Sequence, residues 1–465
     1  MQYLRALLIG ALLCCVPSTA LAQKKPKTVN CHRDLEEALE IVDALWSFKL
    51  FKPGTVDLEQ AFRQLDPEAR RTTDPDACAD LLSRFMARLQ DGHSGLSYMP
   101  GVEYSSPYII VRSQRERLSQ VPGRSPIVHA YVFDRDTTDE VLHSIPRGSE
   151  ILTVDGIAVD SLYRFMEHRV SGSTQQWRDY LCDRRLLRGP AETDFELAYR
   201  EPGAALKTVR LMRPPADTIK EELDNELRVY FGDITHSHWE RLEGGWGYIR
   251  YTSFVHGRLD QTIDRFDEMV DSLLGAPGLI IDLRGNGGGF SAARTEIAGR
   301  FVADKAPLTY LQIRHPGENA VIERIDPTTG SYTTKLPQLV HPREPIYTGP
   351  VVVLIDRGCF SACEAFTGGL KSLGRVLVIG PERSGGGSGA VGGLRLPSGA
   401  VISFSWTVGW LPDGGQIESH GVAPHIVVQE RPRDWAVGRD RVLERAIRAL
   451  EQGEAKPLAE TGPGD

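Results

Sequence analysis

A single serine stands between two cysteines in the segment DRGCFSACEAFTGG, residues 356–369. The apolar run VVVLI precedes it and small residues follow it, so the sequence predicts a buried strand, a sharp turn and a helix. Ser361 lies at the turn, where the unpaired N–H groups and the positive dipole of a helix N-terminus favour a developing negative charge. A hydroxyl there can act as a nucleophile. SACE also fits an ordinary capping box completed by Glu364, and taken alone that use is commoner.

A second segment, GLIIDLRGNGGG (278–289), predicts a buried strand that runs into a glycine loop. Glycines let backbone N–H groups approach a ligand closely, so Gly287 and Gly288 could form an oxyanion hole with the amide of Ala362. The alternatives are a plain turn and a phosphate loop. A phosphate loop needs a lysine after the last glycine, and GGGFSA has none.

Three segments in this order, GLIIDLRGNGGG, VVVLIDRGCFSACEAFTGGLK and LPDGGQIESHGVAPHIVV, resemble the carboxyl-terminal processing (tail-specific) serine protease family. GGWGYIRYTSF and a PDZ-like insert resemble the same family, so the resemblance spans roughly residues 30–450. It implies an α/β fold: a ClpP/crotonase-like core with a mixed or parallel sheet, an N-terminal helical region and an inserted PDZ-like β-rich domain. It also implies that Ser361 is the nucleophile of a serine-type peptidase.

Members of this family differ in the group that activates the serine. One branch uses a lysine further along the chain, on a glycine-flanked strand. This chain reads GPERSGGGSGA there and has no lysine between Lys371 and Lys456. Lys371 itself lies ten residues along the predicted helix, about 15 Å from Ser361 at 1.5 Å per residue. A Ser–Lys dyad is therefore not expected.

The other branch, which includes the tricorn core and the chlamydial secreted protease, uses histidine as the base and glutamate to orient it. The resemblance assigns these roles to His93 in LQDGHSG and Glu418 in QIESHGVAP. Tricorn has a serine just before its histidine, where this chain has Gly92. In the segment that contains Glu418, the family usually has an aspartate after the proline, where this chain has His425. The residues themselves leave His93 open as an exposed turn residue, Glu418 as a solvated loop carboxylate, and His420 as a competing base.

The Ser–His–Glu assignment fits the chemistry of acyl transfer. A serine hydroxyl is a weak nucleophile until a neighbouring base takes its proton. Imidazole titrates near neutrality, so it can accept that proton and return it to the leaving amine. A carboxylate behind the ring fixes its tautomer and stabilises the imidazolium. The chain order of the three residues is no obstacle, because such sites are defined by geometry.

The chain has seven cysteines, of which Cys14 and Cys15 lie in an N-terminal stretch typical of a secretory signal peptide. Five remain after its removal, so at least one thiol stays unpaired in an oxidising compartment. Cys31 and Cys78, on neighbouring predicted helices, are the favoured pair, although sequence alone does not fix connectivity.

Cys359 and Cys363 flank Ser361 and allow three interpretations. They are small apolar packing residues, or one of them is a thiol nucleophile, or they form a redox bridge that closes the site. Packing is favoured, because the serine holds the turn.

Composition narrows the class of protein. Residues 1–22 predict an exported protein, periplasmic or secreted, and no later segment is apolar for long enough to span a membrane. The formal net charge is −8 and no basic stripe appears, which argues against nucleic acid as a partner. The twelve histidines form no HExxH motif, so we expect no metal and no cofactor; HSH at 236–238 is a weak metal candidate.

Changes in the predicted pattern of helices and strands divide the chain into five segments. They are the signal peptide 1–22, the N-terminal helical region 29–100, the PDZ-like domain 105–212, the protease core 225–430, and the C-terminal helix and tail 431–465. The expected partners are protein or peptide substrates, and a homodimer is left open. Two rival functions remain: an inactive peptide- or ligand-binding protein on the same scaffold, and a hydrolase of another ester or amide bond.

Overall fold

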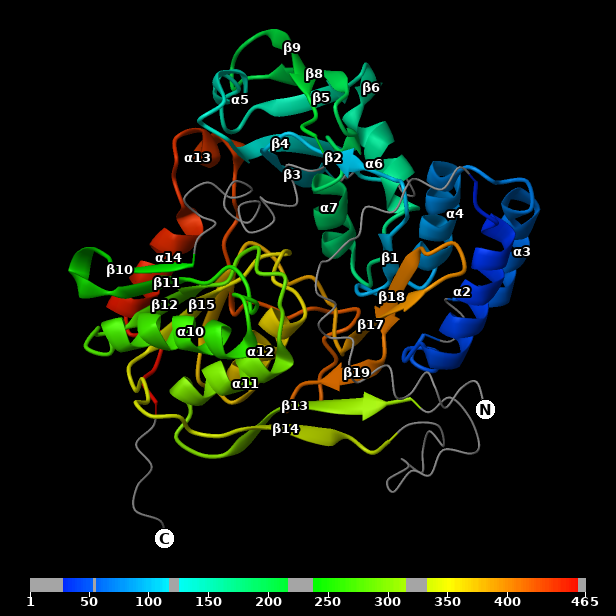
Figure 1. Ribbon diagram of the computed structural model, residues 1–465. Helices are drawn as coiled ribbons and strands as arrows, with labels where there is room; N and C mark the ends of the chain where they lie inside the picture. The colour runs from blue at the N-terminus through cyan, green and yellow to red at the C-terminus, as the bar shows by residue number, and fades with distance from the viewer. Residues whose placement is uncertain (1–27, 53–55, 117–124, 216–236, 315–332, 459–465) are drawn as a thin grey trace.

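The computed structural model describes residues 28–52, 56–116, 125–215, 237–314 and 333–458 (Figure 1). The predicted signal peptide (1–22) and the end of the C-terminal tail lie outside these ranges. Within them, no helix combines the length and apolar character needed to cross a bilayer.

Three helices form the N-terminal region: α2 (Cys31–Leu45), α3 (Leu58–Ala69) and α4 (Pro75–Ala87). Each begins after a residue whose side chain accepts a hydrogen bond from the first helical turn, namely Asn30, Asp57 and Asp74. Such caps satisfy backbone donors that have no partner inside the helix. The local sequence therefore determines where these helices start.

A β-rich insert follows, here defined as residues 104–213. Its antiparallel sheet has the strand order β3-β4-β5-β8-β9, with β6 paired to β5. Helix α6 packs on β4 and β5, and α7 packs on β3. The bounds are β2 (Tyr104–Ser105), β3 (Ile109–Glu116), β4 (Ile127–Arg135), α5 (Glu140–His143), β5 (Glu150–Val154), β6 (Ile157–Ala158), α6 (Val159–Glu167), α7 (Gln175–Asp183), β7 (Gly189–Pro190), β8 (Asp194–Arg200) and β9 (Leu206–Met212).

The core is a mixed sheet in the order β10-β11-β12-β15-β16-β20, with only β10 antiparallel to its neighbour. Alternate strand residues point to opposite faces: Ile281 and Val353 pack with α10, α11 and α12, whereas Ile280 and Val352 pack with α14 (Figure 1). Burial on both faces explains the near-continuous apolar strands. The bounds are β10 (His238–Arg241), η2 (Glu243–Gly245), β11 (Gly247–Arg250), α10 (Leu259–Leu273), β12 (Leu279–Asp282), α11 (Ser291–Ala298), η3 (Gly299–Phe301), β15 (Val351–Leu354), α12 (Ala362–Ser372), β16 (Leu377–Gly380), β20 (Ile426–Val427), α13 (Pro432–Ala436) and α14 (Arg441–Glu451).

Two small sheets join the N-terminal region to the core. One has the order β1-β18-β17 and the other β14-β13-β19. The helices α2 to α4 share one hydrophobic cluster with Ile402 and Phe404 of β18. The sequence-based division treats the N-terminal region and the core as separate segments. The bounds are β1 (Gly95–Tyr98), β13 (Ala306–Ile313), β14 (Leu336–Val340), β17 (Val391–Arg395), β18 (Val401–Ser405) and β19 (Thr407–Trp410). Because β1 pairs with β18, the loop before β1 lies beside the core.

The predicted Cys31–Cys78 bridge is confirmed, and it joins the first turns of α2 and α4 across 47 residues. Replacing both cysteines by serine should lower the free energy of unfolding by about 4 kcal/mol, because a cross-link restricts the unfolded chain. Urea denaturation of the two proteins, followed by circular dichroism, measures the difference. Equal unfolding midpoints would show that the helices hold this region without the bridge.

Candidate active site

The nucleophile candidate Ser361 lies where the central strand β15 has ended and α12 begins. Its backbone has φ 55° and ψ −115°, a positive φ that a non-glycine residue rarely adopts. Strained strand-to-helix turns of this kind present a serine hydroxyl above a sheet in other hydrolases. The strain distinguishes this turn from a simple cap.

Glu364 also caps the helix, as the sequence alternative suggested. Its buried carboxylate accepts hydrogen bonds from the amide of Ser361 (3.1 Å), the amides of Gly386 (2.7 Å) and Gly387 (2.8 Å), and the Ser384 hydroxyl (2.5 Å). Burial raises the pKa of Glu364 to about 7, against the opposing effect of these donors. The carboxylate thus connects the serine turn to the loop that contains residues 384–389, so cap and strained turn coexist.

Cys359 and Cys363 form a disulfide across Ser361. A disulfide contains no thiolate, so neither sulfur can be a nucleophile in this state. The remaining cysteine, Cys182, is a free buried thiol, as the odd count required. The bridge closes a loop of only a few residues around the strained turn.

We expect reduction of this bridge to lower kcat/KM about 10-fold, because backbone strain of ~1–3 kcal/mol at Ser361 would relax without it. Peptide turnover with and without a thiol reductant measures the effect. The double variant Cys359→Ser/Cys363→Ser should show the same loss and no further response to reductant, whereas Cys182→Ser should respond like the wild type. Unchanged turnover on reduction would contradict a role for the bridge.

The glycine loop after β12 lies directly against the serine turn. A Cβ on Gly288 would come within 2.8 Å of the Ala362 amide and 2.9 Å of the Ser361 Cβ, so only glycine fits there. The Gly288 amide donates to Asn286 Oδ1 (2.9 Å), so its predicted role in an oxyanion hole would require it to give up this bond. Among the described residues, no acceptor is recorded for the amides of Gly287 and Ala362. These two donors fit an oxyanion hole best.

His93 lies in the loop between α4 and β1, next to the residue that precedes Ser361. Its ring centroid is 4.8 Å from that of Phe360, and a Cβ on Gly92 would come within 2.6 Å of the same ring. Burial lowers the pKa of His93, although the charge of Asp91 opposes this, so the neutral base form is favoured. Within the described chain no hydrogen bond joins the His93 ring to Ser361. Such bonds commonly tighten only with bound substrate.

Glu418 is buried but makes contacts other than the predicted one. It accepts hydrogen bonds from Lys52 Nζ (2.7 Å) and from the Ser388 amide (3.3 Å), and no hydrogen bond to His93 is present in the described part of the chain. Burial raises the pKa of Glu418 to about 8, and the charge of Lys52 opposes this rise. The His93 Nδ1 atom instead lies 3.4 Å from the Ser405 hydroxyl.

Neither Ser405 nor Lys52 was named from the sequence, because nothing in the local sequence of either residue marks a site. Asp91, two residues before His93, was readable as part of the turn and is in fact completely buried. The sequence shows an aspartate close to a candidate base, but only the structure shows that it is buried.

The insert reaches the site through the start of α7. The Trp177 ring stacks on Phe360 with centroids 3.8 Å apart, the Ser171 hydroxyl donates to the Asp91 carbonyl (2.8 Å), and Thr174 donates to the Gly385 carbonyl. The loop that contains His93 and the turn at Ser361 are therefore both packed against the insert.

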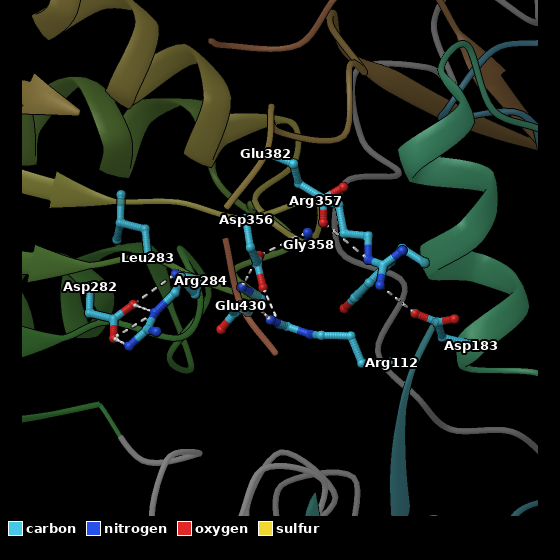
Figure 2. A network of polar contacts seen from close by, with 12 residues as sticks. Arg112, Asp183, Asp282, Leu283, Arg284, Asp356, Arg357, Gly358, Glu382 and Glu430 are labelled. Carbon is cyan, nitrogen blue, oxygen red and sulfur yellow. Dashed lines mark hydrogen bonds and ion pairs between the residues drawn. The ribbon is translucent and has the colours of Figure 1, made fainter. Parts of the chain in front are cut away.

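A charged network makes a second connection between insert and core (Figure 2). Arg112 on β3 donates to Asp356, at 2.6 Å, on the turn that leads to Ser361. Asp356 in turn accepts from the amides of Gly285 (2.8 Å) and Gly358 (2.9 Å), so one carboxylate holds both the glycine loop and the serine turn. Buried charges of this kind are kept in place by mutual pairing.

The alternative bases and the metal candidate lie elsewhere. His420 is exposed, and its ring interacts with the Glu418 carbonyl at 2.9 Å. Lys371 donates to the Ala423 carbonyl at 2.6 Å, away from the serine turn. In the ranges that the structure describes, no cluster of three or more His, Cys, Asp or Glu residues could hold a metal ion. The first residue of HSH, His236, lies outside those ranges.

Known peptidases resemble this chain in sequence. The model of peptidase family S41 matches residues 245–428. The chain is 34% identical over 197 residues to a putative tricorn protease homolog of Streptomyces coelicolor, covering 40% of this chain and 14% of the relative. It is 26% identical over 273 residues to a carboxyl-terminal-processing protease of Picosynechococcus, covering 58% of each. The chain thus spans less than two thirds of the length of these relatives.

Solved structures show the same fold over nearly the whole chain. Mature CPAF in complex with lactacystin superposes with a TM-score of 0.70 at 18% identity, covering 91% of this chain and 99% of that one. A putative peptidase from Parabacteroides merdae gives 0.52 at 21% identity, covering 91% and 97%. These findings support the predicted family resemblance and confirm the α/β fold: residues 245–428 match the model of peptidase family S41, and the chain is similar in fold to CPAF.

Proposed function

We propose that this protein is an exported serine endopeptidase that cleaves peptide bonds by acyl transfer. The observation that carries the proposal is the strained turn at Ser361, which places a hydroxyl at a helix N-terminus against a glycine loop, in a chain of this family. No metal or cofactor is required by this chemistry.

The reaction begins when Ser361 Oγ attacks the carbonyl carbon of the scissile bond and passes its proton to His93 Nε2. The tetrahedral oxyanion accepts hydrogen bonds from the amides of Gly287 and Ala362. His93 then protonates the leaving amine, the C–N bond breaks, and the acyl group remains on Ser361. Water attacks this ester with His93 again as base, which releases the carboxylic acid and restores the hydroxyl. Glu418 supports the base as a buried carboxylate behind the loop.

An extended polypeptide is the substrate that suits the surroundings. The strand β1 begins two residues after His93 and pairs on one side only within the described sheets, so its other edge is open to a substrate main chain. A pocket of about 480 Å³ beside β1 is lined by Leu96, Tyr98, Phe165 and Arg185, among others, and offers room for a substrate side chain. The insert, PDZ-like in sequence, would engage unstructured or carboxyl-terminal segments of the same substrate.

A fluorophosphonate probe tests the nucleophile, and an assay panel tests the bond that is cleaved. We expect the full chain to be labelled at Ser361, as located by mass spectrometry, and to cleave casein or a peptide library. Labelling elsewhere, or no labelling together with no turnover, would favour a binding protein on this scaffold. Turnover of nitrophenyl esters without peptides would favour another hydrolase.

A further inference from the structure

We propose, building on the function above, that Asp91 and Ser405 are positioning residues for His93. In this arrangement the Asp91 carboxylate acts on the imidazole through the Ser405 hydroxyl, and Lys52 binds the predicted partner, Glu418. The base would then be oriented by a hydroxyl from strand β18, more than three hundred residues away in the sequence.

Asp91 is a fully buried carboxylate with an unusually complete set of donors. Its Oδ2 accepts from Trp46 Nε1 (3.0 Å), the Ser94 hydroxyl (2.8 Å) and the Ser405 amide (3.0 Å). Its Oδ1 accepts from the His93 amide (2.9 Å) and the Ser405 hydroxyl (2.9 Å). One side chain therefore fixes the main chain of the base and the rotamer of the neighbouring hydroxyl. Turn formation alone would need only the bonds to residues 93 and 94.

These donors also keep Asp91 ionised. Burial by itself would raise the pKa of Asp91, but the charges of Lys52 and His93 and the hydrogen bonds hold that pKa below its ordinary value. A buried ionised carboxylate is costly unless its partners use the charge. Here the charge of Asp91 raises the pKa of His93 against the effect of burial, so it favours the imidazolium that forms during the reaction.

Ser405 connects the two groups with a defined direction. Its hydroxyl has one proton, which it donates to Asp91 Oδ1 at 2.9 Å. The oxygen can then accept a hydrogen bond from His93 Nδ1, which lies 3.4 Å away. This requires the tautomer with hydrogen on Nδ1, and that tautomer leaves the lone pair of Nε2 for the Ser361 proton. No proton has to leave Asp91 or Ser405 during turnover.

Glu418 is occupied in a separate pair. Lys52 Nζ binds its Oε1 at 2.7 Å and also donates to the Gln90 carbonyl at 2.5 Å, so Lys52 connects Glu418 to the start of the base loop. Burial raises the pKa of Glu418, the charge of Lys52 opposes this rise, and the charge of Asp91 adds to it. The charged groups near His93 therefore include Asp91, Lys52 and Glu418. Of these, Asp91 accepts the hydrogen bonds of Ser405, whose hydroxyl lies 3.4 Å from His93 Nδ1.

Ser405→Ala is the decisive variant, with Ser403→Ala as its matched control. Ser403 lies two residues earlier on β18, and its hydroxyl donates to the His93 carbonyl (3.0 Å) but not to the ring. We expect Ser405→Ala to lower kcat about 10- to 100-fold with KM little changed, as befits loss of one hydrogen bond to a charged group. Ser403→Ala should stay close to the wild type.

The pH profile separates positioning from simple damage. Loss of the hydroxyl removes the path from Asp91 to the imidazolium, so the pKa of His93 should fall further and the acid limb of kcat/KM should move roughly one unit lower. A variant that is merely less well folded would lose activity, but the midpoint of the acid limb of kcat/KM would stay at the same pH. Where turnover is too slow, histidine NMR titration of Ser405→Ala and wild type measures the same pKa directly.

The possible outcomes distinguish the two proposals. An inactive and unlabelled wild type would refute the proposed function. An active wild type whose His93 titration is the same in Ser405→Ala, but changes in Glu418→Gln, would overturn the positioning role of Asp91 and Ser405 and restore Glu418 as the orienting group.

Discussion

Replacement of Ser361 by alanine is expected to lower kcat/KM for peptide cleavage by about 10⁴- to 10⁶-fold. The change removes the hydroxyl that forms the acyl-enzyme, while the Ser361 amide that bonds Glu364 is retained. The variant should therefore unfold at nearly the same temperature as the wild type. Steady-state cleavage of a fluorogenic peptide, with thermal unfolding measured on the same samples, provides both numbers.

A serine on the same helix is the appropriate control. Ser372, in the last turn of α12, donates to Asp413 on the surface and is remote from the turn at Ser361. Ser372→Ala should change kcat/KM by less than about twofold. If Ser361→Ala kept more than a few per cent of the activity with the control intact, the nucleophile would have to lie elsewhere.

Replacement of His93 by alanine should have the second largest effect, a loss of about 10⁴-fold or more in kcat. Without the imidazole, the group proposed to take the serine proton is lost. His420→Ala is the matched control, because its ring is exposed and interacts with the Glu418 carbonyl. A larger loss from His420→Ala than from His93→Ala would reverse the assignment.

The double variant Ser361→Ala/His93→Ala makes this test sharper. Residues that act as one unit give losses that do not multiply, so the double variant should be about as slow as either single one. Multiplicative losses would show that the two side chains act independently, and the proposed acyl transfer would fail.

The pH dependence of the wild type follows from the same base. A histidine whose pKa is lowered by burial stays neutral at pH values below its ordinary pKa of 6.5. The base is active when neutral, so the acid limb of kcat/KM should have its midpoint below 6.5, and activity should persist into mildly acidic solution. A midpoint above 6.5 would show that the imidazolium is stabilised in the free protein.

The elements around the serine were predictable because their signals are local. The apolar strand β15, the turn at Ser361 and the small residues of α12 occupy one short segment, and strand and helix periodicities are read directly from such segments. The caps at Asn30, Asp57 and Asp74 depend on residues within one turn. The family resemblance added His93, whose loop the structure places against Phe360.

Two aspects were visible only in part. Gly288 was correctly placed in the loop facing the serine, but its amide is occupied by Asn286, which depends on the conformation of the loop. The odd number of cysteines predicted at least one free thiol. The structure identifies Cys182 as a free thiol, because the fold brings the sulfurs of the other two pairs together. The Cys359–Cys363 bridge was one of three open interpretations for the same reason.

The sequence by itself determined the turn at Ser361, the glycine loop, the core elements and the family resemblance, because each of these depends on a short local segment. Tertiary structure alone decided which groups surround the base. Ser405 and His93 are 312 residues apart, and Lys52 and Glu418 are 366 apart, so each contact exists only because β1 pairs with β18 and the N-terminal helices share its hydrophobic cluster. Hydrogen bonds are short-ranged and directional, and no one-dimensional pattern encodes which distant donor arrives within 3 Å.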